Sequence, residues 1–155
     1  MEIVLTVNGQ AVTAEIEPSD LLLDFVREEL GLTGAKRSCD VQVCGACTVL
    51  LDGRPVSSCC TLAYEARGRE LVTIEGLAAR PEIEPLERAF ATHAAVQCGF
   101  CTPGLILTVS ALLQDGALGG EEAIRAGLAG NLCRCTGYKG ILEAVREVAD
   151  LAGRA

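Results

Sequence analysis

The chain has 155 residues, half of them apolar but only 3% aromatic, so its core must be built mainly from aliphatic side chains. Thirteen basic and 21 acidic residues give a net charge of −8, which argues against a nucleic-acid or anionic-membrane partner. The start, MEIVLTVNGQ, lacks the basic segment of a signal peptide. The longest near-apolar run, 104–113, is about half the length of a membrane span. We therefore expect a cytoplasmic protein with no membrane span.

Four predicted strands form two hairpins in the first 80 residues. Asn-Gly and Asp-Gly favour two-residue turns because both central positions take positive φ. These dipeptides occur at Asn8-Gly9 and Asp52-Gly53. The strands that they join are predicted at residues 3–7, 11–16, 47–52 and 54–58.

A single helix is predicted between the hairpins, over residues 18–31. Ser19 or Asp20 is its expected N-cap, and Gly31 stands at the expected end. One helical face is apolar and carries Leu22, Phe25, Val26 and Leu30. A last strand is predicted over residues 70–77. Together these elements predict a small α+β domain with the helix on one face of a mixed sheet.

The second half of the chain has a helical period. Pro81 and Pro85 are expected to stop regular structure in a linker at 78–85. Beyond it, helices are predicted at 85–95, 103–114, 120–129 and 139–153, and their short loops predict a compact four-helix bundle. We expect domains at 1–77 and 86–155.

Local signals mark the ends and faces of two of these helices. Thr102 is the expected cap of the second helix, with Pro103 at its first position and Gly116 beyond its end. The last helix is predicted to bury Ile141, Leu142, Val145, Val148, Ala149 and Ala152.

Four cysteines crowd into CDVQVCGACTVLLDGRPVSSC, residues 39–59. Cys39, Cys44 and Cys47 follow the C-x4-C-x2-C spacing with which plant-type ferredoxins hold a 2Fe–2S cluster, and Cys59 follows further on. Backbone N–H groups of the loop can stabilise the negative charge of four thiolates on such a cluster. Gly45 lets the backbone come close to the inorganic sulfides.

Zinc and disulfides are the alternatives. Structural zinc sites usually pair two short C-x2–4-C knuckles, whereas here three cysteines share one loop. Disulfides are disfavoured in the cytosol, and nine cysteines leave one over. Spacing favours the 2Fe–2S cluster but does not decide between Cys59 and Cys60 as fourth ligand. A Cys60 that is not a ligand is expected to be buried.

A second set of cysteines lies in QCGFCTPG and NLCRCTGYKG. Both pairs precede predicted helices, where N-terminal N–H groups favour thiolate charge. Spacing alone fits zinc almost as well as iron–sulfur here, and a thiol–disulfide enzyme is a weaker third alternative. The set comprises Cys98, Cys101, Cys133 and Cys135.

Taken in order, CDVQVCGACTVLLDGRPVSSC, QCGFCTPG and NLCRCTGY resemble the iron–sulfur subunit of the xanthine dehydrogenase/carbon monoxide dehydrogenase family of molybdenum hydroxylases. The resemblance covers roughly residues 3–150. It implies a β-grasp, ferredoxin-like 2Fe–2S domain followed by an all-α four-helix-bundle 2Fe–2S domain. It implies one cluster on Cys39, Cys44, Cys47 and Cys59, thus favouring Cys59 over Cys60, and another on Cys98, Cys101, Cys133 and Cys135.

The resemblance also implies roles near the molybdenum cofactor. Gln97 matches the family glutamine that hydrogen-bonds the pyranopterin, although spacing alone would make it an ordinary loop amide. Cys135 would lie near the same pterin. The chain departs from the family in having Ser38 where glycine usually precedes the first cysteine, and Val41-Gln42-Val43 where the loop is usually Gly-rich or small and polar. These departures affect the expected loop conformation and cluster potential, not the ligand spacing.

We see no catalytic site of the chain's own. The single histidine, His93, falls in a predicted helix and is expected to be a partly buried helix residue. The resemblance implies an electron conduit in a dimer of heterotrimers. A large subunit would hold the molybdenum–pterin centre, and a medium subunit would hold FAD. Electrons would pass singly through the helical-domain cluster, then the ferredoxin-like cluster, to FAD or another acceptor.

Two other functions stay open at this stage. One is a zinc-binding adaptor without redox activity, and the other is a free-standing diffusible ferredoxin. The substrate of the complex would be chosen by a pocket in another polypeptide, and candidates include purines, carbon monoxide, aldehydes and N-heteroaromatics.

Overall fold

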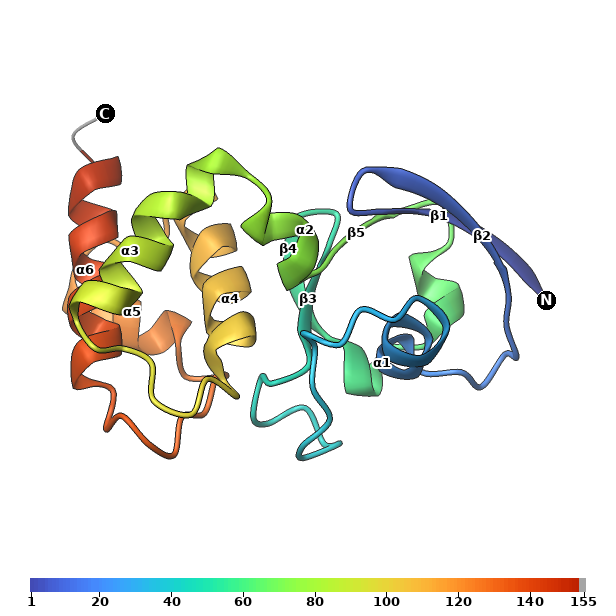
Figure 1. Ribbon diagram of the computed structural model, residues 1–155, viewed down its shortest axis with the longest axis horizontal. Helices are drawn as coiled ribbons and strands as arrows, with labels where there is room; N and C mark the ends of the chain where they lie inside the picture. The colour runs from blue at the N-terminus through green and yellow to red at the C-terminus, as the bar shows by residue number, and fades with distance from the viewer. Residues whose placement is uncertain (154–155) are drawn as a thin grey trace.

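The computed structural model describes residues 1–153. Figure 1 shows a twisted sheet with its short helix at the N-terminal side of the molecule and a group of helices at the C-terminal side. The sheet is mixed, has five strands in the order β2-β1-β5-β3-β4, and pairs β1 with β5 in parallel. The strands are β1 (Glu2–Val7), β2 (Gln10–Glu15), β3 (Thr48–Leu51), β4 (Arg54–Ser57) and β5 (Glu70–Val72).

Both predicted hairpins are confirmed. Asn8 and Gly9 turn β1 into β2 with φ values of 51° and 81°, and Asp52 and Gly53 turn β3 into β4 with 49° and 77°. Positive φ at both central positions gives a turn whose twist matches that of the strands. The α+β fold class is confirmed as well.

The helix predicted over 18–31 is shorter and partly irregular. It consists of α1 (Leu22–Asp24) and a five-residue π-helix, η1 (Phe25–Glu29). The predicted caps are wrong, because the Asp20 carboxylate accepts the Glu17 N–H at 2.8 Å and the N-cap is Leu21. The Leu22 N–H donates to the Thr61 carbonyl at 2.8 Å. A tertiary pairing thus replaces the first predicted helical turn.

The predicted apolar face of this helix is largely confirmed. Leu22, Phe25 and Val26 are buried in the core of the sheet domain, and Leu30 packs against that core while partly buried. Gly31 stands beyond the end with φ 67°. Two short 3-10 turns, η2 (Ser58–Cys60) and η3 (Ala63–Ala66), lead from β4 towards β5.

The last predicted strand, 70–77, ends early, at Val72. Asn8 Oδ1 accepts the Thr73 N–H at 2.9 Å, and Asn8 Nδ2 donates to Thr73 Oγ1 at 3.0 Å, so the side chain of Asn8 ends the β ladder. The chain continues as α2 (Ile74–Ala78). The prolines at 81 and 85 begin elements instead of stopping them, in η4 (Pro81–Ile83) and α3 (Glu84–Thr92), because an N-terminal turn does not need their missing N–H.

The four predicted helices are confirmed as α3, α4 (Thr102–Gln114), α5 (Glu121–Gly127) and α6 (Lys139–Ala152). Pro103 lies in the first turn of α4, and Gly116 follows its end with φ 64°. Thr102 is not the cap: Cys101 holds that position, and Thr102 Oγ1 is buried without a hydrogen-bond partner. On α6 the predicted face is buried from Ile141 to Val148, whereas Ala149 is only partly buried and Ala152 is exposed.

The two halves pack directly on each other. Leu50 of β3 and Val72 of β5 belong to the core of the helical half, where they join Leu105, Leu107 and Val109 of α4. The other core lies between the sheet and α1–η1. Within residues 1–153, no helix is long and apolar enough to cross a membrane.

Candidate metal centres

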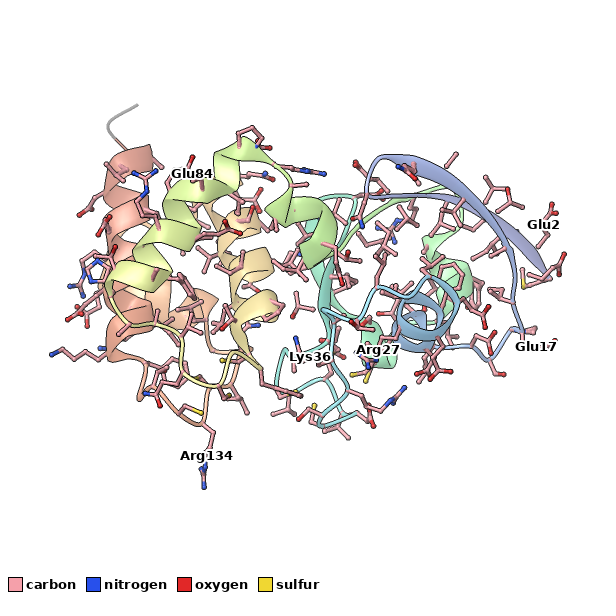
Figure 2. All side chains as sticks on the ribbon, in the orientation of Figure 1. Glu2, Glu17, Arg27, Lys36, Glu84 and Arg134 are labelled. Atoms are coloured by element: carbon pink, nitrogen blue, oxygen red, sulfur yellow. The ribbon has the colours of Figure 1, made fainter. Side chains whose placement is uncertain are left out.

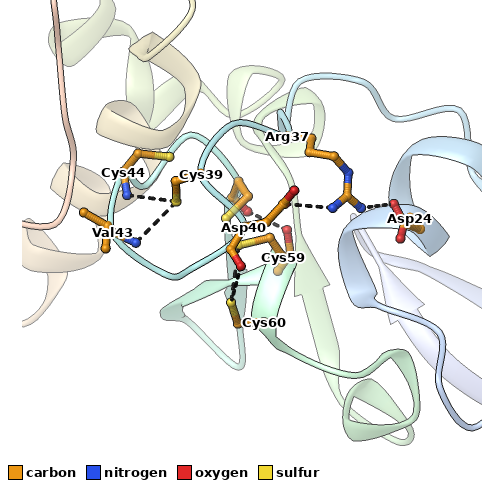
Figure 3. Close-up of polar contacts among 10 residues, drawn as sticks. Asp24, Arg37, Cys39, Asp40, Val43, Cys44, Cys59 and Cys60 are labelled. Atoms are coloured by element: carbon orange, nitrogen blue, oxygen red, sulfur yellow. Dashed lines mark hydrogen bonds and ion pairs between the residues drawn. The ribbon is translucent and has the colours of Figure 1, made fainter.

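The loop at 39–44 wraps around one sulfur. The N–H groups of Val43 and Cys44 each donate to Cys39 Sγ at 3.4 Å (Figure 3). The loop reaches this shape with two non-glycine residues in the left-handed region, Asp40 at φ 54° and Gln42 at φ 58°. Val41 and Val43 consequently face outwards and are 66% and 53% exposed. The unusual Val-Gln-Val sequence is therefore compatible with a tight loop.

Arg37 ties this loop to the rest of the sheet domain. Its Nη1 donates to Asp40 Oδ1 at 2.7 Å, and its other terminal nitrogen pairs with Asp24 of α1 (Figure 3). The hydrogen bonds to Asp24 and Asp40 raise the pKa of Arg37. The loop conformation is thus anchored from α1.

The remaining cysteines of the first half lie around the same place. Cys44 lies next to Cys39, whose Sγ accepts its N–H, and Cys59 lies near Cys47. Cys47 and Cys59 are buried. The turn η2 points Cys59 inwards and Cys60 outwards, so the expectation that Cys60 is buried is wrong. Cys60 Sγ lies 3.6 Å from Cys59 Sγ and 3.8 Å from the Asp40 carbonyl oxygen.

The second set of cysteines is also arranged in pairs. Cys98 and Cys135 face each other with their Sγ atoms 3.6 Å apart, and Cys101 lies near Cys133. Cys101 is the N-cap of α4. Cys133 and Cys135 precede α6, as the sequence predicts, and Thr136 Oγ1 donates to Cys133 Sγ at 3.1 Å.

Tyr138 holds the segment that carries Cys133. Its hydroxyl accepts the Cys133 N–H and donates to the Asn131 carbonyl, both at 2.9 Å. Tyr138 takes φ 66° at the N-cap of α6, where a non-glycine residue needs a compensating interaction. This role of Tyr138 was not predicted from the sequence, where its only signal is its place three residues after Cys135.

Backbone donors and burial act oppositely on the thiol pKa values. N–H groups of Val41, Val43 and Cys44 lower the pKa of Cys39 to about 6. Burial raises the pKa of Cys47 to about 11 and that of Cys101 to about 12. Metals bind the thiolate, so a metal centre in either place would displace the protons of Cys47 or Cys101.

The spacing of Cys98 and Cys135 fits two thiolates on one metal. Two thiolates on one tetrahedral metal, with metal–sulfur bonds of about 2.3 Å, lie about 3.8 Å apart, close to the 3.6 Å between Cys98 and Cys135. Over residues 1–153, no three histidine, cysteine or acidic side chains converge to hold a single ion. A cavity of about 660 Å³ adjoins both sets, and its lining includes Cys44, Cys98, Cys101, Cys133 and Cys135.

The backbones of the two cysteine-bearing regions touch. The Leu132 N–H donates to the Cys44 carbonyl at 2.8 Å, and Asn131 Nδ2 lies 3.4 Å from the Gly45 carbonyl oxygen. A Cβ on Gly45 would overlap Asn131 and the Gly130 carbonyl, so glycine is required there for contact between the halves. Contact with Asn131 is thus a role of Gly45 in addition to the predicted close approach of its backbone to the first cluster.

Gln97 and His93 lie outside these pairs. Gln97 is exposed and directly precedes Cys98 in the chain. His93 is the C-cap of α3 and partly buried, as expected, and its Nε2 lies 2.6 Å from Glu147 Oε2 on α6. It therefore joins two helices.

Two family models match the chain. The one described as 2Fe-2S iron-sulfur cluster binding domain covers residues 5–78, and the one described as [2Fe-2S] binding domain covers 73–146. The chain is 46% identical over 142 residues to the nicotinate dehydrogenase small FeS subunit of Eubacterium barkeri, covering 92% of this chain and 90% of that protein. It is 46% identical over 143 residues to the xanthine dehydrogenase iron-sulfur-binding subunit of Escherichia coli, a match that covers 90% of this chain and 89% of that protein.

Solved structures agree over the whole fold. Quinoline 2-oxidoreductase from Pseudomonas putida 86 has a chain with a TM-score of 0.91 and 42% identity, covering 100% of this chain and 97% of that one. Aldehyde oxidoreductase from Desulfovibrio gigas matches with a TM-score of 0.90 and 40% identity. The match covers 100% of this chain but only 18% of that much longer one. The chain, with its two 2Fe–2S-binding domains, belongs to the electron-transferring small iron–sulfur subunits of the xanthine dehydrogenase and aldehyde oxidoreductase family of molybdenum hydroxylases.

Proposed function

We propose that one 2Fe–2S cluster is held by Cys39, Cys44, Cys47 and Cys59 and the other by Cys98, Cys101, Cys133 and Cys135. The grouping of the cysteines carries this proposal, because each set brings its thiols near one another and the Sγ atoms of Cys98 and Cys135 lie 3.6 Å apart, a spacing that suits two thiolates on one iron. The burial of Cys59 beside Cys47 supports Cys59 over the exposed Cys60. Each cluster, when bound, takes up and releases one electron at a time.

The chain itself supplies a direct connection between the two ligand sets. The Cys44 carbonyl accepts the Leu132 N–H at 2.8 Å, and Leu132 is bonded to Cys133. A single backbone hydrogen bond therefore links a proposed ligand of the first cluster to one of the second. Buried apolar contacts between β3 and α4 keep that link in place. Such a rigid connection suits a subunit whose task is to conduct electrons.

We further propose that the chain works between a large molybdenum–pterin subunit and a medium FAD subunit, in a dimer of heterotrimers in the cytoplasm. In the Desulfovibrio gigas enzyme the equivalent unit is less than a fifth of a longer chain, which supports association with a larger protein. Exposed apolar side chains at both cysteine regions also favour burial against partners. They are Val41, Val43, Val96, Phe100 and Leu132.

Gln97 is proposed to face the partner's pterin. Its exposed side chain lies beside Cys98 and is free to reach a group outside this chain. Gln97→Ala is expected to leave both clusters in place and to slow their reduction by the molybdenum subunit. The measurement is substrate-driven reduction of the clusters in the purified complex, and an unchanged rate would make Gln97 an ordinary loop residue.

The ligand sets are tested by changing one cysteine in each. The full chain is purified anaerobically, its iron and acid-labile sulfide are counted, and the reduced paramagnetic resonance spectrum is recorded. About four irons, four sulfides and two distinct rhombic signals are expected. Cys44→Ser should remove one signal and Cys101→Ser the other. Zinc without iron, or equal loss of both signals in either variant, would contradict the proposal.

A further inference from the structure

Lys36 lies between the two cysteine regions. Its backbone N–H donates at 2.9 Å to the carbonyl of Ala46, which stands between Cys44 and Cys47. Its Nζ lies 5.7 Å from the ring centroid of Phe100, which stands between Cys98 and Cys101. Figure 2 shows Lys36 at the junction of the two halves of the molecule. One residue of the sheet domain therefore contacts the loops of both proposed clusters.

Neighbouring groups fix the position of this side chain. Lys36 Nζ donates to the Gly34 carbonyl at 2.8 Å, and the Gly34 N–H donates to Glu75 Oε1 of α2 at 2.8 Å. Arg27 of η1 donates to the Ala35 carbonyl at 2.6 Å. The loop that carries Lys36 is thus held by α2 and η1. The ammonium group of Lys36 lies over the Phe100 ring.

The surroundings of Lys36 make its charge effective. Burial lowers the pKa of Lys36, while the carboxylate of Glu75 opposes that change; Arg27 and Cys101 are the other charged or titratable groups that face it. A charge partly shielded from water acts more strongly on its neighbours than a fully solvated one. The ammonium group of Lys36 lies over the Phe100 ring of the second region, whereas its contact with the first region is made by the backbone N–H.

We propose that the positive charge of Lys36 stabilises the reduced form of the second cluster and so biases the electron towards it. The proposed ligands of this cluster are Cys98, Cys101, Cys133 and Cys135. This inference rests on the proposed ligand sets. Reduction of a cluster adds one electron and no atom, so the cluster gains one negative charge. A nearby cation lowers the free energy of the reduced form and thereby raises the reduction potential of that cluster.

The test is a redox titration of the full chain with both clusters, followed by paramagnetic resonance so that the two signals are measured separately. Lys36→Met is expected to make the second cluster about tenfold harder to reduce relative to the first, a change of about 59 mV for a one-electron couple. Lys36→Arg keeps the charge and should stay close to the parent protein. Glu75→Gln removes the opposing negative charge, while its amide oxygen can still accept the Gly34 N–H, and should shift the potential the other way.

Arg88→Met serves as the matched control. Arg88 is an exposed cation on α3 that pairs with Glu84, so its loss should change neither potential. The role of Lys36 is overturned if Lys36→Met leaves the difference between the two potentials unchanged, or if Lys36→Arg shifts it as much as Lys36→Met. Those results, obtained with two intact signals, leave the proposed ligand sets standing. A parent chain without two signals would instead refute the ligand sets themselves.

Discussion

Gly45→Ala is expected to loosen the junction between the two halves. Gly45 has φ 69°, and an added Cβ would lie 2.9 Å from Asn131 Cγ and still closer to the Gly130 carbonyl oxygen. Ordinary contact would require a displacement of at least 0.5 Å, which would stretch the 2.8 Å hydrogen bond from Leu132 to Cys44. An alanine in the left-handed conformation costs about 1–2 kcal/mol, the stretched hydrogen bond about 1 kcal/mol and the overpacking about 1–3 kcal/mol. We therefore expect the free energy of unfolding to fall by about 3–6 kcal/mol.

Gly53→Ala separates backbone strain from the contact between the halves. Gly53 has a similar φ of 77°, but an added Cβ there meets no atom within 4 Å. Gly53→Ala should therefore lower the free energy of unfolding by only about 1–2 kcal/mol. Urea unfolding of the full chain measures both losses, and paramagnetic resonance of the doubly reduced protein shows whether the magnetic interaction between the clusters weakens in Gly45→Ala alone. Equal destabilisation of the two variants would refute the role of Gly45 at the junction.

Two further predictions concern Tyr138 and Asp52. Tyr138→Phe leaves the Cys133 N–H and the Asn131 carbonyl without their partner, so we expect a loss of roughly 1–3 kcal/mol in urea unfolding and a change confined to the second cluster's spectrum; a change confined to the first would contradict this. A hydrogen bond from Arg69, aided by the Glu70 N–H, lowers the pKa of Asp52 from 3.8. The ionised Asp52 therefore stabilises the fold above pH 3.8, and this stabilisation is lost as the pH falls through the lowered pKa of Asp52. In acid unfolding followed by circular dichroism, Asp52→Asn should lose stability less steeply with falling pH than the parent chain. Equal steepness would refute the contribution of Asp52 to the pH dependence of stability.

The sequence predicted best what depends on neighbouring residues. The turns at Asn8-Gly9 and Asp52-Gly53 require positive φ, and the dipeptides themselves carry that preference. Pro103 likewise marks the first turn of α4. The family resemblance predicted both 2Fe–2S domains because the cysteine motifs and their order are specific.

The failures arise where distant segments compete with local preference. The first turn of the helix predicted over 18–31 is lost because the Leu22 N–H pairs with the Thr61 carbonyl, 39 residues away in the sequence. The strand predicted over 70–77 stops at Val72 because the side chain of Asn8 takes the next backbone N–H. Neither partner can be identified from the periodicity of the segment itself.

The junction between the halves is hidden from sequence reasoning for the same reason, yet it is built from the segments that carry the cysteines. Cys44 and Gly45 contact Asn131 and Leu132, directly beside Cys133. A Cβ on Gly104, in the first turn of α4, would overlap the Gly45 carbonyl. The backbone that orients the thiols therefore also sets the separation of the two proposed clusters. Exposed side chains such as Val41 and Val43 can consequently vary to suit a partner without changing the link between them.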